Sequence, residues 1–309
     1  MPKREPVGVI GLGIMGSAMA ANIVAAKFPV LGYDVLPKRR AALVEAGGRA
    51  TKSAGELAGR SSVVITSLPS AQALHDVAGE LAAAGRRGQV VIETSTLPIA
   101  VKEDARVALA KRGVTLLDCP LSGTGAQARV RDLVVYASGE RSAYRRSVPV
   151  MEAFARAHYF LGAFGAGSKM KFLANLLVAI HNVSTAEAMV LGRRAGLDPA
   201  TMVKVLGDGA GSSRMLQVRG PMMAAGDYSA AAMKVGVWQK DMKIIGEFAR
   251  EHDCPTPLFA ATTPIYNAAM ALGFAESDTA CVCAVLERWA GSADRKATPR
   301  RRRRGIRET

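Results

Sequence analysis

The feature that most constrains this chain is a short glycine pattern near its start. Gly11, Gly13 and Gly16 form a G-x-G-x-x-G run that follows an apolar run at residues 7–10 and opens a helical pattern. In that context Gly11 permits a tight turn, Gly13 lets the backbone approach a pyrophosphate, and Gly16 lets the helix pack closely on the strand. The helix N-terminus then faces the phosphates with free N–H groups. The pattern predicts a dinucleotide-binding βαβ unit.

An acidic residue at the expected distance strengthens this prediction. Asp34 ends the next apolar run, 18 residues after Gly16, where a carboxylate can accept hydrogen bonds from an adenosine ribose. An ionised carboxylate repels the 2′-phosphate of NADP, which favours NAD, whereas the basic residues 38–40 soften the discrimination and leave NADP open. The alternative is that Asp34 only starts a turn ahead of Pro37.

The first half of the chain alternates apolar strand-like runs with helical patterns. Expected strands cover residues 7–10, 30–33, 63–67, 90–93 and 114–117, with further strands at 133–137 and 158–161. Expected helices cover residues 15–26, 38–46, 71–84 and 99–111. Such βαβα alternation with Val/Ile/Leu-rich strands predicts a parallel sheet buried on both faces. We therefore expect an α/β Rossmann NAD(P)-binding domain over residues 1–164.

The second half has the composition of helices. Ala, Met and Leu recur at helical spacing over residues 168–195, and the Gly-Leu-Asp-Pro sequence at 196–199 ends that helix and starts the next. Further helices are expected at 199–206, 235–251, 257–272 and 279–289. The pattern predicts an all-α C-terminal domain over residues 165–290, for substrate binding and oligomerisation.

The positive charge of the chain is concentrated at its end. The 309 residues carry a formal net charge of +15, and residues 291–309 contain eight Lys or Arg against two acidic residues. A like-charge run without apolar residues cannot support a core, so a disordered basic tail is expected over 291–309. Contact of this tail with nucleic acid is the alternative, and no nucleic-acid partner is expected.

Composition also bears on location and metals. The apolar stretches are interrupted well before the roughly 20 residues that a membrane span needs, and the N-terminal residues do not read as a signal peptide. We expect a cytoplasmic protein without membrane association. Four cysteines, of which only Cys281 and Cys283 are close in sequence, predict reduced, buried thiols and no metal site.

Several segments between residues 7 and 290 together resemble one known family. They are Gly11-Leu12-Gly13-Ile14-Met15-Gly16 with Met19, Ala20 and Asn22, then Leu68-Pro69-Ser70, Glu93-Thr94-Ser95-Thr96, Asp118-Cys119-Pro120-Leu121-Ser122-Gly123-Thr124, Gly162, Gly165 and Gly167 with Lys171 and Asn175, and Lys240-Asp241. The pattern is similar to that of the β-hydroxyacid dehydrogenases, which include 3-hydroxyisobutyrate dehydrogenase and tartronate semialdehyde reductase. The resemblance implies hydride transfer between NAD(P) and a small 3-hydroxy acid or its oxidised form, in a homodimer or homotetramer.

The resemblance also implies site residues. Cofactor contacts are expected from Gly11, Leu12, Gly13, Ile14, Met15, Gly16, Asp34, Leu68, Pro69, Thr96 and Lys240. Ser122 and Gly123 follow a predicted strand end, where a hydroxyl and backbone N–H groups can receive a carboxylate, or else they form an ordinary turn. Lys240 and Asp241 can alternatively be a solvated helix pair.

Lys171 is the expected general acid/base, with Asn175 beside it. The two residues are one helical turn apart and share a face. Carbonyl reduction needs a proton for the developing alkoxide, and alcohol oxidation needs that proton removed. Burial and the positive nicotinamide ring lower the pKa of a lysine towards working pH. Lys169 is expected to face solvent.

The sequence departs from the family pattern on the substrate side. Thr124 stands where a second glycine is usual, Arg131 replaces a further glycine, and Ala174 replaces the first of two helix amides. Thr124 and Arg131 are therefore expected to influence which acid is accepted. Arg131 either binds a second anionic group or points into solvent.

Two other functions remain open. An imine reductase shares the expected architecture, but such enzymes generally carry Asp or Tyr in place of the catalytic lysine, so Lys171 argues against it. A non-catalytic cofactor-domain scaffold with a nucleic-acid-binding tail is the other, and the intact glycine pattern argues against that.

Overall fold

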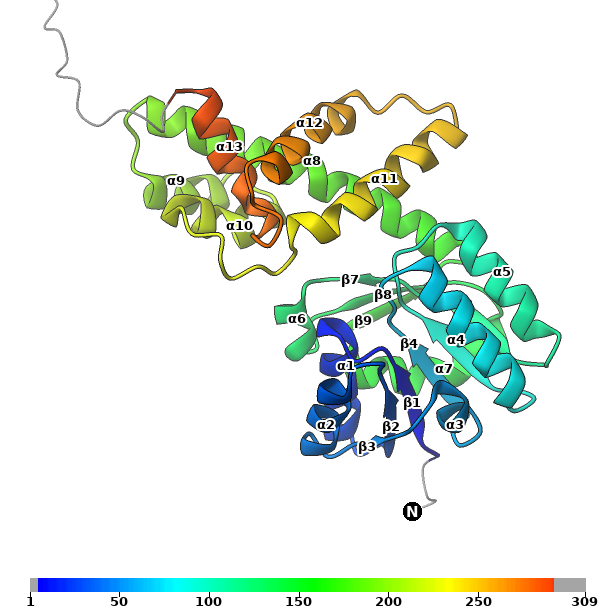
Figure 1. The fold of residues 1–309 in the computed structure, drawn as a ribbon. Helices are drawn as coiled ribbons and strands as arrows, with labels where there is room; N and C mark the ends of the chain where they lie inside the picture. The colour runs from blue at the N-terminus through cyan, green and yellow to red at the C-terminus, as the bar shows by residue number, and fades with distance from the viewer. Residues whose placement is uncertain (1–4, 292–309) are drawn as a thin grey trace, which may run out of the picture. The chain divides into compact units, whose positions relative to one another are not determined.

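The computed structural model describes residues 5–291 (Figure 1). They form two compact units, residues 5–177 with 240–255 and residues 178–239 with 256–291. The first unit contains every residue expected to touch cofactor or substrate. The predicted basic tail lies outside the described residues from position 292 onward, and the predicted domain limits at 164 and 290 stay a prediction.

A six-stranded parallel sheet forms the centre of the first unit. Its strands are β1 (Val7–Ile10), β2 (Val30–Tyr33), β3 (Arg49–Ala50), β4 (Val63–Thr66), β5 (Val90–Glu93) and β6 (Thr115–Asp118), in the order β3-β2-β1-β4-β5-β6. The order reverses between β1 and β4, which is where open α/β sheets bind ligands beyond the carboxyl ends of their strands. The predicted Rossmann fold class is confirmed.

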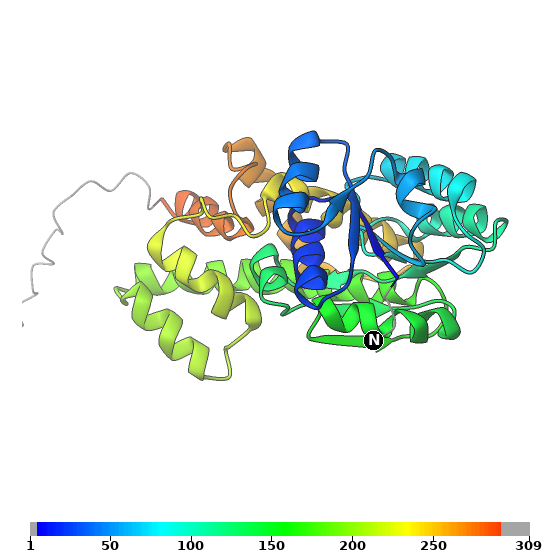
Figure 2. The same ribbon diagram turned by 90° about the horizontal axis from the view of Figure 1, so that it is seen from below.

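Helices cover both faces of this sheet (Figures 1 and 2). One face packs against α1 (Ile14–Ala25), α2 (Pro37–Glu45) and α7 (Arg141–Phe154), and the other against α3 (Ala54–Ala58), α4 (Ala71–Ala84) and α5 (Ile99–Ala110). Successive strand residues alternate between two apolar cores: Ile65 faces the first and Val64 the second. This double burial explains why the strands are continuous apolar runs.

A second sheet of three strands lies after β6. It contains β7 (Leu121–Ser122), β8 (Val134–Ala137) and β9 (Ala157–Phe160), with β7 antiparallel and β9 parallel to β8. The short helix α6 (Gly125–Arg129) connects β7 to β8, and the Asn22 amide of α1 donates to the Ala128 carbonyl oxygen at 2.7 Å. This bond fixes the segment after Ser122 against the first helix of the cofactor domain.

Helix α8 (Ala166–Arg194) contributes to both units, the first of which takes it up to Leu177. Among the described residues it is the one helix long and apolar enough to span a membrane, with a mean hydropathy of 1.2, and 44% of its most apolar window is buried. The core helix of a globular protein meets the same criterion, so these properties do not by themselves indicate a membrane span.

The second unit is helical, as predicted. It contains the end of α8, the start of α11 (Val235–Glu251), and α9 (Pro199–Asp208), α10 (Arg214–Ala225), α12 (Pro257–Ala271), the 3-10 turn η1 (Thr279–Cys281) and α13 (Val282–Trp289). Buried Asp278 organises this unit by accepting hydrogen bonds from Arg219 Nε at 3.0 Å and from the Ala232 and Met233 N–H groups at 2.8 and 3.0 Å.

Candidate active site

The three glycines of the loop after β1 differ in the space around them, and the backbone is open only at Gly13. Gly11 has a φ of +87°, and a Cβ there would lie 2.2 Å from the Ser67 carbonyl oxygen. A Cβ at Gly16 would lie 1.8 Å from the Gly11 oxygen, so packing of the loop excludes side chains at both positions. At Gly13, in contrast, a Cβ would meet no described atom within 4 Å. The free surface at Gly13 fits a pyrophosphate approaching the backbone.

The N-terminus of α1 is suited to an anion. Within the described residues, no side chain caps this helix end and no acidic residue stands in its first turn. Its first turn includes Ile14, which is 61% exposed, and partly buried Met15. The unpaired N–H groups and the positive end of the helix dipole therefore point at the open surface beside Gly13.

Asp34 lies at the carboxyl end of β2 and is bonded on both carboxylate oxygens. Its Oδ2 accepts the Leu12 N–H at 2.8 Å and pairs with Arg39 Nη1 at 3.2 Å, and its Oδ1 accepts the Leu36 N–H at 2.9 Å. Arg40 Nη1 donates to the Asp34 carbonyl oxygen at 2.5 Å. Asp34 thus starts a turn, as the alternative interpretation has it, and also holds the glycine loop. Its contact with a ribose stays a prediction.

The loops after β4 and β5 are joined by hydrogen bonds. Ser95 Oγ accepts the Leu68 N–H at 2.8 Å, and Pro69 follows on the exposed side. Lys240 of α11 donates from Nζ to the Thr96 carbonyl oxygen at 2.7 Å. The structure therefore brings together residues that are far apart in sequence but were expected on the nicotinamide side of one site.

The segment expected to receive substrate begins in β7. Ser122 is partly buried, and Gly123 adopts a φ of +135° with an added Cβ 2.6 Å from Leu133 Cδ2. Thr124 caps α6: its N–H donates to Gln127 Oε1 at 3.0 Å, and its Oγ1 accepts the Gln127 N–H at 3.4 Å. The Thr124 backbone N–H is already bonded, which sequence reasoning did not foresee. Its hydroxyl hydrogen stays available as a donor.

Arg131 is directed to the protein surface. It is exposed with a φ of +60°, and its Nη2 donates to the Glu152 carbonyl oxygen of α7 at 2.6 Å. The guanidinium is thus bonded at the end of a helix that covers the sheet. Of the two interpretations of Arg131, the structure favours the solvent-facing one.

Lys171, Asn175 and Asp241 form a cluster between α8 and α11. Asn175 and Asp241 are 4% and 5% exposed, and Asn175 Nδ2 donates to Asp241 Oδ2 at 2.9 Å. Lys240 Nζ lies 3.6 Å from Asp241 Oδ1. The sequence did not predict the bond between Asp241 and Asn175. Lys169, two residues before Lys171, is exposed as expected.

The surroundings of Lys171 lower its pKa. Burial lowers its pKa, the Asp241 carboxylate opposes this, and the nearby Lys240 charge lowers the pKa further, so the net result lies below the ordinary lysine value of 10.5. Burial raises the pKa of Asp241, while Lys240 and Lys171 oppose that shift. An amine with a lowered pKa can take up and release a proton nearer neutral pH than a free lysine.

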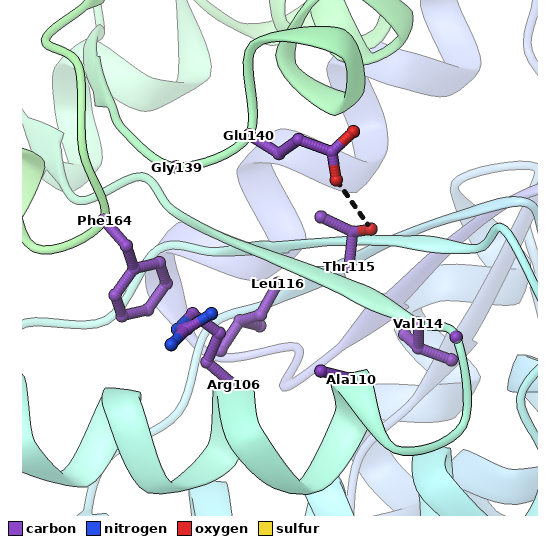
Figure 3. Close-up of a pocket in the computed structure, with 9 residues that line it drawn as sticks. Arg106, Ala110, Val114, Thr115, Leu116, Gly139, Glu140 and Phe164 are labelled. Atoms are coloured by element: carbon purple, nitrogen blue, oxygen red, sulfur yellow. Dashed lines mark hydrogen bonds between the residues drawn. The ribbon is translucent and has the colours of Figure 1, made fainter.

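A cavity of about 380 Å³ lies elsewhere in the first unit (Figure 3). Arg106 lies over the Phe164 ring at 5.6 Å, and Thr115 Oγ1 donates to Glu140 Oε2 at 3.4 Å across its wall. Its described lining includes none of the expected site residues. The described chain also holds no group of three or more His, Cys, Asp and Glu side chains placed to bind a metal ion.

Two family models match the chain in sequence. The model described as the NAD binding domain of 6-phosphogluconate dehydrogenase matches residues 6–162. The model described as NAD-binding of NADP-dependent 3-hydroxyisobutyrate dehydrogenase matches residues 165–286. Together they span nearly all of the described residues.

Several similar proteins are dehydrogenases. L-threonate dehydrogenase of Cupriavidus necator is 36% identical over 89% of this chain and 94% of its own. The crystal structure of 3-hydroxyisobutyrate dehydrogenase from Salmonella typhimurium superposes with a TM-score of 0.83 at 30% identity, covering 91% of this chain and 99% of that one. An imine reductase from Pseudomonas sp. is more distant, with a TM-score of 0.62 at 21% identity over 92% of this chain and 99% of its own, and shares the fold.

Proposed function

This chain belongs to the β-hydroxyacid dehydrogenase family, that of 3-hydroxyisobutyrate dehydrogenase, and from that premise we propose that Lys171 is the general acid/base of its reaction. The chain is an NAD(P)-dependent oxidoreductase that acts on a small 3-hydroxy acid or its oxidised form. The dehydrogenase homologues are more similar in sequence to this chain than the imine reductases are. An imine reductase activity is therefore the less supported function.

The observation that carries the proposal is the cluster at Lys171. A partly buried amine with a lowered pKa lies in the same compact unit as the glycine loop and the Leu68 and Thr96 loops. When bound, the nicotinamide accepts or donates the hydride. In the oxidation direction Lys171 removes the proton of the substrate hydroxyl, and in the reduction direction it returns that proton.

Asn175 orients the substrate in this proposal. The Asp241 carboxylate can only accept, so it takes one Nδ2–H of Asn175 and fixes which end of the amide faces the site. The amide oxygen and its second N–H then stay available to the reacting hydroxyl or the acid group. Ser122 Oγ, the Gly123 N–H and the Thr124 hydroxyl are proposed to receive the substrate carboxylate. Arg131, which is exposed and donates to the Glu152 carbonyl oxygen, is not part of this proposed carboxylate site.

NAD is the proposed preferred cofactor, with NADP as the alternative. The Asp34 carboxylate at the end of β2 repels a 2′-phosphate and can accept from ribose hydroxyls. Arg39 pairs with this carboxylate while its side chain is 47% exposed, so a phosphate has one cation within reach. The ratio of kcat/KM with NAD⁺ to that with NADP⁺ measures the preference, and we expect a ratio above one.

We propose that the chain forms a homodimer or homotetramer and lies in the cytoplasm. Exposed apolar side chains along α8, at Leu173, Leu177 and Leu191, support the oligomer. The molar mass of the purified protein in solution tests this proposal. A monomer at micromolar concentration would contradict it.

The experiment that tests the function is turnover with a panel of small 3-hydroxy acids, including 3-hydroxyisobutyrate and L-threonate, and either cofactor. We expect turnover of at least one acid and a loss of about 10²- to 10⁴-fold in kcat for Lys171→Ala. Lys169→Ala is the matched control because this exposed lysine lies on the same helix turn. Retained turnover in Lys171→Ala would contradict the assigned role, and no turnover by a wild-type protein that binds cofactor would contradict the substrate class.

A further inference from the structure

Three ionisable side chains are completely buried beneath the proposed site. Glu93 at the end of β5, Lys102 on α5 and Asp118 at the end of β6 each have 0% relative exposure. Lys102 Nζ lies 2.7 Å from Glu93 Oε2 and 2.8 Å from Asp118 Oδ1. The mechanism proposed above uses none of these groups directly.

One arm of this cluster ends on the helix that carries Lys171. Asp118 Oδ2 accepts the Ser168 N–H at 2.7 Å, and Asp118 Oδ1 accepts the Ser168 hydroxyl at 2.8 Å. Ser168 lies in the first turn of α8, three residues before Lys171. A carboxylate bonded to first-turn N–H groups caps a helix and interacts favourably with its dipole.

The other arm ends on the loops of the proposed nicotinamide site. Glu93 Oε1 accepts the Ser95 N–H at 2.9 Å, and Ser95 Oγ in turn accepts the Leu68 N–H. Lys102 therefore connects, through one carboxylate on each side, the loops after β4 and β5 to the start of α8.

The charges of the cluster match this arrangement. Although burial lowers the pKa of Lys102, Asp118 and Glu93 raise it above its ordinary value, so Lys102 stays charged. Two carboxylates and one ammonium group leave one negative charge, which the positive N-terminus of α8 offsets. If the sole task were to hold the core together, apolar residues of similar volume would serve as well or better. The ion cluster adds defined directions and distances.

The start of α8 is also closely packed against the strands. A Cβ at Gly167 would lie 2.2 Å from the Tyr136 carbonyl oxygen and 2.7 Å from the Asp118 carbonyl oxygen. The Gly167 N–H donates to Ser138 Oγ at 2.9 Å. Changes in the cluster are therefore transmitted to the helix start rather than absorbed by loose packing.

We propose that Lys102 is a positioning residue, which through Glu93 and Asp118 fixes the distance between the nicotinamide-side loops and the Lys171 amine. This inference rests on the proposed function of Lys171. It predicts that disturbing the cluster impairs the chemical step while cofactor binding, which depends largely on the glycine loop and Asp34, changes little. A misplacement of about 1 Å is enough to reduce a rate by about 10²-fold.

The deciding variant is Ser168→Ala. It removes only the hydroxyl bond to Asp118 and leaves the backbone N–H bond in place, whereas Lys102→Met buries two carboxylates without their cation and can unfold the chain. Ser147→Ala is the matched control, because Ser147 is also fully buried in the first unit and its hydroxyl donates to a carbonyl, that of Ala143 at 2.9 Å.

We expect Ser168→Ala to lower kcat by about tenfold or more. The dissociation constant of NADH, measured by fluorescence titration, should stay within about twofold, and the deuterium isotope effect on kcat, with deuterium at the reacting carbon, should rise because hydride transfer becomes rate-limiting. Ser147→Ala should change neither. A purely structural role would lower the unfolding temperature without raising the isotope effect.

The outcomes separate this inference from the proposed function. If Lys171→Ala abolishes turnover while folded Ser168→Ala keeps wild-type kcat and isotope effect, the positioning role of Lys102 is wrong and the function of Lys171 stands. If Lys171→Ala retains turnover, the proposed function fails, and with it the basis for this inference.

Discussion

At the scale of single residues, two neighbouring charges act on Lys171 in opposite directions. Burial and Lys240 lower its pKa, whereas Asp241 raises it. Asp241 also accepts a hydrogen bond from Asn175, so it combines an electrostatic effect with a geometric one. An Asp-to-Asn change at this position separates the two effects, because the amide oxygen can still accept that bond.

The pH dependence of turnover tests the electrostatic part. Alcohol oxidation needs the neutral amine, so kcat for oxidation is highest above the pKa of Lys171 and falls as the pH drops below it. Carbonyl reduction needs the protonated amine, so kcat for reduction is highest below this pKa and falls as the pH rises above it. Asp241→Asn removes the group that raises this pKa, so the midpoint of the oxidation profile should move to lower pH. Asp76→Asn, on the exposed side of α4, is the control, and a midpoint that moves upward would count against the assignment.

The glycine loop gives a second prediction at this scale. Gly13→Ala should fold with a stability loss of no more than about 1 kcal/mol, since its Cβ meets open space, but should bind NADH weakly. Gly16→Ala should lose stability outright, because its Cβ would overlap the Gly11 carbonyl oxygen. Thermal unfolding and NADH titration of both variants decide the matter, and tight NADH binding by Gly13→Ala would show that the cofactor does not approach there.

At the scale of elements, the short helix α6 determines the shape of the proposed substrate loop. Thr124 and Gln127 form a reciprocal capping box, and Gln127 Nε2 also donates to Asp132 Oδ2 at 2.9 Å. The loop after Ser122 is thereby held by side-chain bonds at both ends of α6. Thr124, which replaces a usual glycine, is needed for this cap.

Gln127→Ala should loosen this loop. We expect a stability loss of about 1 kcal/mol, a rise of several-fold in KM for the hydroxy acid and an unchanged KM for the cofactor. Denaturant unfolding and steady-state kinetics measure these quantities. Gln72→Ala, an exposed amide change at the start of α4, should leave both KM values at the wild-type level. An unaltered acid KM in Gln127→Ala would remove α6 from the substrate site.

Two helices that the sequence did not predict, α7 and α10, contain residues that disfavour a helix. Helix α7 contains Pro149 and three arginines, so its pattern reads as a polar connection, although it buries Val150, Met151 and Phe154 on one face. Helix α10 contains Gly220 and Pro221. Strands buried on both faces were predicted almost to the residue, because a short continuous apolar run between helical patterns indicates a strand of a parallel sheet.

Some features of the candidate site could likewise be predicted from the sequence, and others could not. The glycine loop, Asp34, Lys171 and Asn175 belong to local motifs and were predictable from spacing. The bond between Asn175 and Asp241 and the role of Lys102 depend on contacts between residues 66 and 16 positions apart, for which one sequence carries no signal. A lysine in a helical pattern reads as a solvent-facing residue unless its carboxylate partners are known.

At the scale of the whole molecule, charge is distributed unevenly along the chain. The formal net charge is +15, and the last nineteen residues hold a net +6 of it. Every proposed site residue lies in the first unit, before residue 256. Catalysis and any nucleic-acid contact should therefore reside in different parts of the chain.

Truncation after Gly291 tests this separation. We expect kcat and KM of the shortened protein to equal those of the full chain, because every proposed site residue lies before the cut. Binding to double-stranded DNA, followed at increasing salt, provides the second readout, and any affinity should fall in the truncated form. A large loss of turnover on truncation would contradict the separation.

The bonding of Asp34 has a consequence for how cofactor preference can evolve. The same carboxylate that disfavours a 2′-phosphate also secures the Leu12 N–H of the glycine loop. A mutation at Asp34 that improves NADP binding would therefore also disturb the glycine loop, and selection would oppose it. An additional positive charge beside Arg39 would favour NADP and leave that loop intact. Cofactor specificity and the conformation of the glycine loop thus depend on the same carboxylate.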